Sequence, residues 1–176
     1  TIIGKRFSYP KALYAVHDTI NFAIANKPNA LILDFFAGSG TTMHAVNLLN
    51  AEDGGHRRCI MVTNNEVSAD EAKTLKDKGY KPGDEEWEKL GIAHYVTWPR
   101  TVCTIEGHDV NGNPLKGDYL GSEPELHMAD GFKANAAFFK LSFLDSTAVS
   151  LGMCFSEMLP TLWMKAGAKG KCPELS

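Results

Sequence analysis

Residues 31–42 read Leu-Ile-Leu-Asp-Phe-Phe-Ala-Gly-Ser-Gly-Thr-Thr, and this stretch indicates the fold of the chain. The apolar run at 30–35 is typical of a buried parallel strand, and Asp34 lies near its end. The glycines of 38–40 let the backbone turn sharply and approach a ligand without an obstructing Cβ atom. Residues 40–49 have the apolar spacing of a helix, whose free N–H groups favour an anionic group. The stretch therefore predicts a strand, a ligand-binding loop and a helix.

The neighbouring segments extend this pattern into a larger α/β arrangement. Apolar residues at helical spacing predict a helix over 12–25. A second apolar run, 58–63, predicts another strand, which is followed by Asn64-Asn65-Glu66. Strand, helix and strand within ~35 residues form a βαβ unit with a right-handed crossover. We therefore expect an α/β protein: a partial doubly wound, Rossmann-like sheet with a C-terminal β-hairpin and helix appendage.

The chain becomes more polar after the second predicted strand. Residues 68–90 are rich in Lys, Asp and Glu and predict exposed helix and loop, with a further helix over 87–96. Asn111-Gly112-Asn113 lies between the segments 102–107 and 115–120, which is a hairpin pattern. The spacing of acid and amide side chains at 109–113 also resembles the start of a calcium loop, but the hairpin turn is the stronger prediction.

The remaining C-terminal elements are predicted from shorter patterns. We expect a loop over 121–129, a strand over 136–144, a helix over 152–166 and a flexible tail at 167–171. On these grounds residues 1–100 form a cofactor-binding α/β core, and residues 101–176 form an appendage packed on the same core.

Composition limits the classes of protein that this chain can represent. At 176 residues, 44% hydrophobic and 22% charged, it has the make-up of a soluble globular domain. Four cysteines and six histidines show no metal-ligand spacing, and neither a membrane-length apolar run nor a signal peptide is visible. We therefore expect a cytoplasmic protein without a metal site. The net charge of −3 means that any DNA contact must be local or supplied by other parts.

The predicted loop and strand ends suit a nucleotide-type ligand. Asp34 and Glu66 stand at the ends of the two strands, and ligands of doubly wound sheets bind beyond the carboxyl ends of the strands. Glu66 is placed to accept hydrogen bonds from a ribose diol. Met43 occupies the position of the third glycine of a dinucleotide motif, and no Gly-Lys-Ser/Thr follows, which disfavours NAD and ATP. A tight turn that binds nothing is the simpler alternative.

Three segments resemble one enzyme family. Residues 34–42, Asp-Phe-Phe-Ala-Gly-Ser-Gly-Thr-Thr, resemble the S-adenosylmethionine motif of amino-group DNA methyltransferases, in particular the permuted β class that includes type III restriction-modification Mod subunits. Phe-Ser-Tyr-Pro-Lys at 7–11 and Val-Thr-Asn-Asn-Glu at 62–66 are similar to the segments that flank this motif in the family. The segment 97–100 and Gly131-Phe132 are similar to its C-terminal parts, less specifically.

The resemblance implies S-adenosylmethionine as cofactor. Its methionine part would lie against the glycine loop, Glu66 would bind the ribose, and the segment at Lys11 would close over the methionine. Lys11 could equally be a solvated lysine, and Asn65 either contacts adenine or turns the chain. The cofactor-binding residues expected from the resemblance are Pro10, Lys11, Asp34, Phe35, Phe36, Ala37, Gly38, Ser39, Gly40, Thr41, Thr42, Asn65 and Glu66.

One functional segment of this family is missing from the sequence. The enzymes attack a flipped base with an Asp/Asn-Pro-Pro-aromatic loop, whereas none of the eight prolines here is adjacent to another. We therefore assign no catalytic residue and expect a C-terminal fragment of a DNA methyltransferase that is inactive by itself. The resemblance favours adenine-N6 over cytosine-N4, and it implies DNA as partner of the full-length protein, with a second copy or a restriction subunit as candidate protein partners.

Two other functions remain open from the residues alone. A non-catalytic α/β module could bind a nucleotide-like ligand or serve as an assembly surface. A fragment of an NAD-dependent oxidoreductase is the third hypothesis, and Met43 disfavours it.

Overall fold

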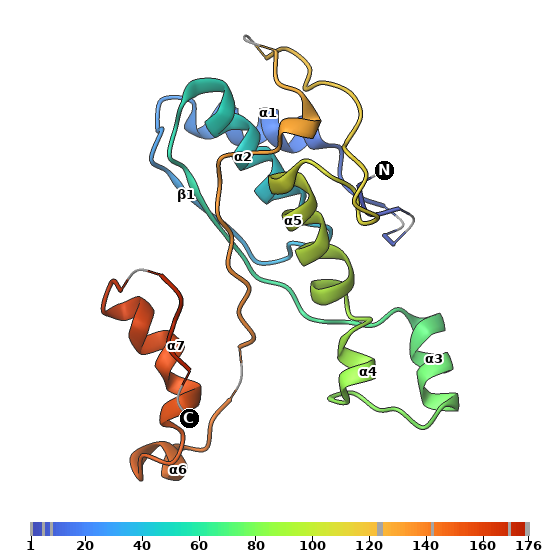
Figure 1. Cartoon of the computed structure of the whole chain (residues 1–176), viewed down its shortest axis with the longest axis vertical. Coiled ribbons are helices and arrows are strands. Elements are labelled where there is room, and N and C mark those ends of the chain that lie inside the picture. Colours follow the sequence, from blue (N-terminus) through green and yellow to red (C-terminus); the bar gives the residue numbers. More distant parts are fainter. Residues whose placement is uncertain are drawn as a thin grey trace. The chain divides into compact units, whose positions relative to one another are not determined.

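The computed structural model of the chain describes residues 2–4, 6–7, 9–122, 125–141, 143–168 and 170–174 (Figure 1). The chain divides into two compact units, Thr1–Ala137 and Phe138–Ser176. Within the described parts, no helix is long and apolar enough to cross a membrane. The predicted division into residues 1–100 and 101–176 stays a prediction.

The first unit begins with the predicted helix and βαβ arrangement. Helix α1 (Leu13–Ile24) precedes strand β1 (Leu31–Asp34), helix α2 (Thr41–Asp53) and strand β2 (Arg58–Met61). The two strands are parallel, with Leu31 opposite Arg58 and Asp34 opposite Met61. The predictions for these four elements are confirmed. The pattern of apolar residues within each short segment is enough to predict a strand or a helix.

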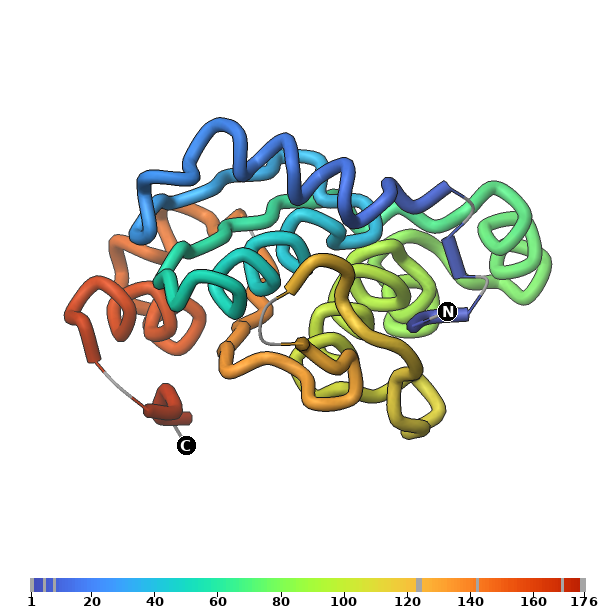
Figure 2. The backbone as a smooth tube through the Cα atoms, turned by 90° about the horizontal axis from the view of Figure 1, so that it is seen from above, coloured from blue at the N-terminus to red at the C-terminus, as the bar shows by residue number. Residues whose placement is uncertain are grey.

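Helix α2 is the central element of this unit. It begins after Gly40 and ends at Gly54, both with positive φ, a conformation that glycine adopts without steric cost. Residues 44–49 are all buried, and α2 contacts α1, β2 and α5 (Trp98–Glu106). Figure 2 shows α1 and α2 running alongside one another.

The two-stranded sheet is covered unequally. Ile32, Cys59 and Met61 are partly buried, whereas Leu31, Leu33 and Ile60 on the alternate positions are 54%, 50% and 49% exposed. Parallel sheets are normally buried on both faces. The fold is therefore mixed α/β with a small parallel sheet, and the larger doubly wound sheet stays a prediction.

Polar segments follow β2, as predicted for residues 68–90. Helix α3 (Ala69–Asp77) starts at Ser68, whose Oγ accepts a hydrogen bond from the Glu71 backbone N–H at 3.4 Å and donates one to Glu71 Oε2 at 2.7 Å. This reciprocal pair is a capping box. The predicted helix over 87–96 is replaced by α4 (Glu85–Glu88) and a π-helix, η1 (Ala93–Thr97), that runs into α5.

The prediction of a C-terminal β-hairpin is wrong. Residues 102–106 of its first arm belong to α5, which ends before Gly107, because the helical spacing of Arg100, Cys103 and Thr104 places these residues on one buried face. The turn itself exists: Asp109 Oδ1 accepts hydrogen bonds from the backbone N–H groups of Asn111 and Asn113 at 2.8 and 3.0 Å. Beside the turn, His108 and Pro114 form an isolated bridge. The second arm, 115–120, is not a strand, and its Asp118 forms an isolated bridge with His127.

The segment after the turn lies in the C-terminal part of the first unit. The predicted loop at 121–129 ends in a short 3₁₀ helix, η2 (Met128–Asp130), and Glu123 and Pro124 lie outside the described residues.

In the second unit, the described residues form helices α6 (Ser146–Ser150) and α7 (Phe155–Lys165). Helix α7 confirms the prediction over 152–166, although Pro160 lies inside it. The predicted strand at 136–144 is wrong for its described residues, which leave out Ser142. Apolar composition alone does not make a strand, because the backbone also needs a hydrogen-bonding neighbour.

Candidate cofactor-binding site

The loop between β1 and α2, residues 35–40, lies against the carboxyl end of β2. The Val62 N–H donates to the Asp34 carbonyl at 2.7 Å, and the Ala37 N–H donates to the Val62 carbonyl at 3.2 Å. The Gly40 N–H then donates to the Ala37 carbonyl at 2.8 Å. These bonds continue the pairing of the strands into the loop, so the glycines lie at the edge where both strands end.

The carboxylate of Asp34 spans this loop. Its Oδ1 accepts from the Phe36 N–H at 3.0 Å, and its Oδ2 accepts from Thr42 Oγ1 at 2.6 Å. One side chain therefore connects the end of β1, the middle of the loop and the first turn of α2. Asp34 determines the shape of the loop, whatever the loop binds.

Thr97, at the end of η1, supports the loop from the other side. Its Oγ1 donates to the Gly38 carbonyl at 2.6 Å, and its Cγ2 would lie 3.4 Å from a Cβ atom at Gly40. Gly38 and Gly40 have φ angles of +51° and +78°. Larger residues would be strained at both positions.

Arg100 of α5 reaches the same place from within the core. Its Nη1 donates to Ser39 Oγ and Thr41 Oγ1, both at 2.9 Å, and to the Ser39 carbonyl at 3.4 Å. The side chain is buried, and burial lowers the pKa of Arg100 from its usual value. The Nε atom has no hydrogen-bond partner.

The segment at 9–11 meets the loop through its backbone. Thr41 Oγ1 donates a long hydrogen bond of 3.5 Å to the Lys11 carbonyl, while the side chains of Pro10 and Lys11 are exposed. The ring of Phe7 lies 3.6 Å from the position of a Cβ atom on Gly38. The structure thus brings the predicted N-terminal segment to the glycine loop. Ser8, part of the same motif, lies outside the described residues.

Asn65 and Glu66 follow β2 and have different surroundings. Asn65 Nδ2 donates to the Glu88 carbonyl and to Glu88 Oε2, both at 2.8 Å, and Asn65 Oδ1 accepts from the N–H groups of Ala93 and His94 at 3.1 and 3.3 Å. Its amide therefore joins α4 to η1. Glu66 is exposed, and its Oε1 accepts from Asn64 Nδ2 at 3.3 Å.

Aromatic side chains beside the loop are exposed to solvent. Phe35 is 62% exposed, Phe36 88% and Tyr9 89%, whereas Ala37 and Ser39 are buried. The loop therefore exposes the rings of Phe35 and Phe36 and buries Ser39.

Two residues of this arrangement were missed by sequence reasoning, Thr97 and Arg100. Both belong to the segment 97–100, whose similarity to the family is less specific. The available signal was an arginine on the face shared by Cys103 and Thr104, since a charge on a buried helical face needs partners.

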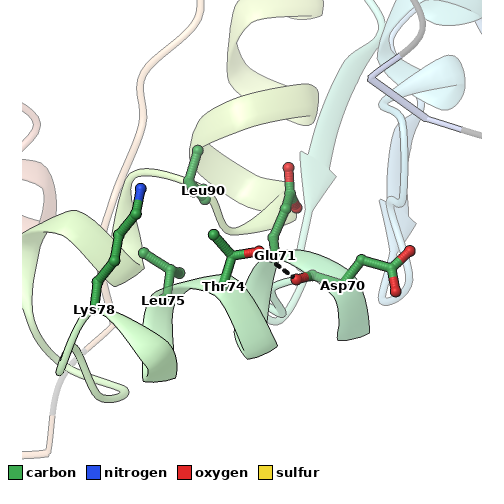
Figure 3. A pocket seen from close by; sticks show the side chains of 6 residues that line it. All are labelled: Asp70, Glu71, Thr74, Leu75, Lys78 and Leu90. Carbon is green, nitrogen blue, oxygen red and sulfur yellow. Dashed lines mark hydrogen bonds between the residues drawn. The ribbon is translucent and has the colours of Figure 1, made fainter.

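Other hollows lie away from the loop. One is formed by α3 and the segment after α4, where Thr74 and Leu75 lie below Leu90 (Figure 3). Another lies beside His17, whose Nδ1 and Nε2 are 2.9 and 2.8 Å from Asp18 Oδ1 and Glu52 Oε2. Burial lowers the pKa of His17, but these two carboxylates outweigh it and raise the pKa above 6.5. The described residues contain no cluster suited to a metal ion.

Comparison with known proteins identifies the family. A family model for DNA methylase, of the N6 and N4 type, matches residues 4–105. The type II methyltransferase M.KpnI of Klebsiella pneumoniae is 54% identical over 62 residues, 35% of this chain and 14% of that protein. The type III restriction-modification enzyme StyLTI Mod subunit of Salmonella typhimurium is 42% identical over 79 residues, 45% of this chain and 12% of that subunit.

A second Mod subunit, that of the type III restriction-modification enzyme EcoPI of Escherichia phage P1, is 40% identical over 78 residues, 44% of this chain and 12% of that subunit. These three matches cover 12–14% of the length of each relative. The matched region 4–105 includes the glycine loop, both strands and nearly all of α5. The chain belongs to the DNA methylase family of the N6 and N4 type.

Proposed function

We propose that this chain is the S-adenosylmethionine-binding part of a site-specific DNA methyltransferase that acts on adenine N6. The observation that supports this most is the glycine loop, which Asp34, Thr97 and Arg100 hold from three sides at the start of α2. A loop that merely turns the chain does not need three separate side chains to define it.

The residues present fit this cofactor. The start of α2 together with the Arg100 guanidinium, whose Nε has no hydrogen-bond partner, suits the carboxylate of the methionine part. A Cβ atom at Gly40 would lie 3.4 Å from Thr97 Cγ2, so glycine there lets the loop pack closely on η1. The exposed carboxylate of Glu66 suits the ribose hydroxyl groups. When bound, the cofactor supplies an activated methyl group. The predicted residues of the loop and of 10–11 would surround its amino-acid end.

Asn65 enters this proposal in a different role from adenine contact. Its amide makes four hydrogen bonds to Glu88, Ala93 and His94, and Gly91 packs so closely that a Cβ atom there would overlap the Asn65 side chain. We propose that Asn65 positions the segment after β2, which carries Glu66.

The base-attacking residues belong, in this proposal, to another part of a longer enzyme. The sequence has no Asp/Asn-Pro-Pro-aromatic loop, and the matches cover only 12–14% of each relative. DNA would be bound by the whole enzyme, with a second copy or a restriction subunit as its protein partner. The isolated chain should bind the cofactor without methylating DNA.

A non-catalytic assembly module is the second candidate function. The observation that favours it is the exposed face of the sheet, where Leu31, Leu33 and Ile60 are about half exposed. A face of this kind is normally covered in a parallel sheet.

Calorimetric titration separates these candidates. We expect the chain to bind S-adenosylmethionine and S-adenosylhomocysteine, and to bind NAD and ATP much more weakly. Asp34→Ala should lose binding because the loop changes shape, and Glu66→Ala because a ligand contact is removed. Glu86→Ala, an exposed acid on α4, is the matched control and should bind normally. A folded chain that binds neither of the first two ligands would contradict the proposal.

A methylation assay tests the second part of the proposal. The chain is incubated with DNA and cofactor carrying a labelled methyl group, and the DNA is then counted. We expect no transfer, and measurable transfer would show that residues of this chain attack the base.

A further inference from the structure

The start of α2 contains a buried charge that the sequence motif does not include. Arg100 is 7% exposed, and its guanidinium reaches the first turn of α2 through Nη1. Helix α2 has 13 residues, so its amino end carries the full partial positive charge of a helix terminus. A cation at that end adds to the positive charge already there.

Nothing in the described part of the chain neutralises this cation. Its contacts are the hydroxyl groups of Ser39 and Thr41 and the Ser39 carbonyl, and Nε has no partner. The titratable side chains that interact with it electrostatically are Tyr119 and His44, and neither is a carboxylate. Burying an unpaired charge is costly, and removing its anionic partner usually destabilises the site further. The arrangement is more favourable when an anion lies at this helix terminus.

The other buried arginine of the first unit shows the contrast. Arg57 is 4% exposed and lies near the opposite end of α2, where Asp53 accepts from its Nη2 at 2.7 Å and from its Nη1 at 2.9 Å. That arginine has its carboxylate within the chain. Arg100 is similarly buried and has none.

The hydrogen bonds of Arg100 also connect it to two parts of the proposed site, the glycine loop and the segment at Lys11. Ser39 Oγ and Thr41 Oγ1 are 3.1 Å apart, and Thr41 Oγ1 donates to the Lys11 carbonyl. One guanidinium thus connects α5, the glycine loop and the segment at Lys11. A change at Arg100 would be transmitted to both groups of predicted cofactor residues.

We infer that Arg100 is a positioning residue that makes the start of α2 selective for a ligand with a carboxylate, so that the amino-acid end of the nucleoside cofactor is recognised by its negative charge. This inference rests on the proposed function. Arg100 acts through Ser39 and Thr41 and through its charge, and it takes no part in transferring the methyl group.

The test compares two ligands that differ in this carboxylate. S-Adenosylhomocysteine and its decarboxylated analogue are titrated into the full chain by calorimetry. The wild-type chain should prefer the first, and Arg100→Met should reduce that preference by about tenfold, the size of one charge interaction at a partly buried helix terminus. Binding of the decarboxylated analogue should change much less. Because Nη1 makes all the contacts, Arg100→Lys should retain most of the preference.

Arg57→Met is the matched control, because it removes an equally buried arginine from the same unit. It should lower stability and leave the ligand preference unchanged. If Arg100→Met keeps the preference to within about twofold, the inference is wrong. The inference is also wrong if the wild-type chain binds both ligands equally. This comparison needs no variant, so it remains available if the Arg100→Met chain does not fold. A folded wild-type chain that binds neither ligand overturns the proposed function, and the inference with it.

Discussion

The carboxylate of Asp34 provides the sharpest test of how the glycine loop is held. In the structure it accepts one hydrogen bond from the Phe36 backbone and one from Thr42, and together these bonds fix both ends of the loop. Replacing Asp34 by alanine should therefore destabilise the fold even when no ligand is present. Glu66→Ala should leave stability within about 0.5 kcal/mol, because Glu66 is exposed.

The size of the effect follows from the two bonds. Hydrogen bonds to a charged group contribute roughly 1.5–3 kcal/mol when buried. The bond from Phe36 is exposed and contributes less, about 0.5–1 kcal/mol, while the 2.6 Å bond from Thr42 is partly buried and contributes about 1–1.5 kcal/mol. Asp34→Ala should thus lower the free energy of unfolding by about 2 kcal/mol, and Thr42→Val by about 1 kcal/mol.

Urea unfolding measures these differences. Circular dichroism and tryptophan fluorescence are followed together, and coincident transitions justify a two-state treatment. A double-mutant cycle with Asp34→Ala, Thr42→Val and the combined variant isolates the bond between the two side chains. We expect a coupling energy of about 1 kcal/mol. The unliganded chain is used, so that ligand binding does not contribute.

Two results would refute this reasoning. If Asp34→Ala unfolds at the same urea concentration as wild type, the carboxylate does not brace the loop. If the two single variants are additive, the loop is destabilised by something other than the bond between Asp34 and Thr42. Loss of cofactor binding in Asp34→Ala would then have to reflect direct contact with the ligand.

The remaining predictions concern backbone strain, a histidine and a thiol. Gly40→Ala should lower both stability and affinity for S-adenosylhomocysteine, whereas Gly112→Ala, at a similar φ in open space, should lower stability alone by about 1–2 kcal/mol, as urea midpoints and calorimetry will show. The raised pKa of His17 makes its contribution to stability complete below pH 6.5 and lost as the pH rises through the folded pKa. Between about pH 6 and about pH 9 the wild-type chain should therefore lose more unfolding free energy than His17→Gln, and equal losses would exclude this role. Burial raises the pKa of the Cys59 thiol to about 12, so iodoacetamide at neutral pH should alkylate it in urea and hardly at all in the folded chain, as mass spectrometry can measure.

The sequence predicted the elements whose signals are local. The order of α1, β1, α2 and β2 follows from the apolar spacing of 12–25, 30–35, 40–49 and 58–63, and the structure agrees to within a few residues at most ends. Residues 102–107 were misassigned because a short apolar segment beside a turn fits a strand and a helix equally well. The burial of Arg100, Cys103 and Thr104 on one face favours the helix.

The candidate site divides in a similar way. The glycine loop and the acids at the ends of the two strands could be recognised in the sequence. A sharp turn requires glycine and a charged strand end requires an acid, so both features restrict the residue type. The partners that hold the loop come from 59 and 61 residues away, at Thr97 and Arg100. Their roles depend on the packing of α5 against α2, which no local pattern encodes.

By itself, the sequence determined a βαβ arrangement, a glycine loop between its first strand and its helix, and a family resemblance that comparison with known proteins confirmed. Tertiary structure decided which distant groups hold that loop, namely Thr97 and the buried Arg100, and it engaged Asn65 with Glu88 and η1. The physical reason is one of range. Backbone conformation and apolar periodicity depend on near neighbours, whereas burial, unpaired charge and hydrogen-bond partners depend on which distant segments are packed together.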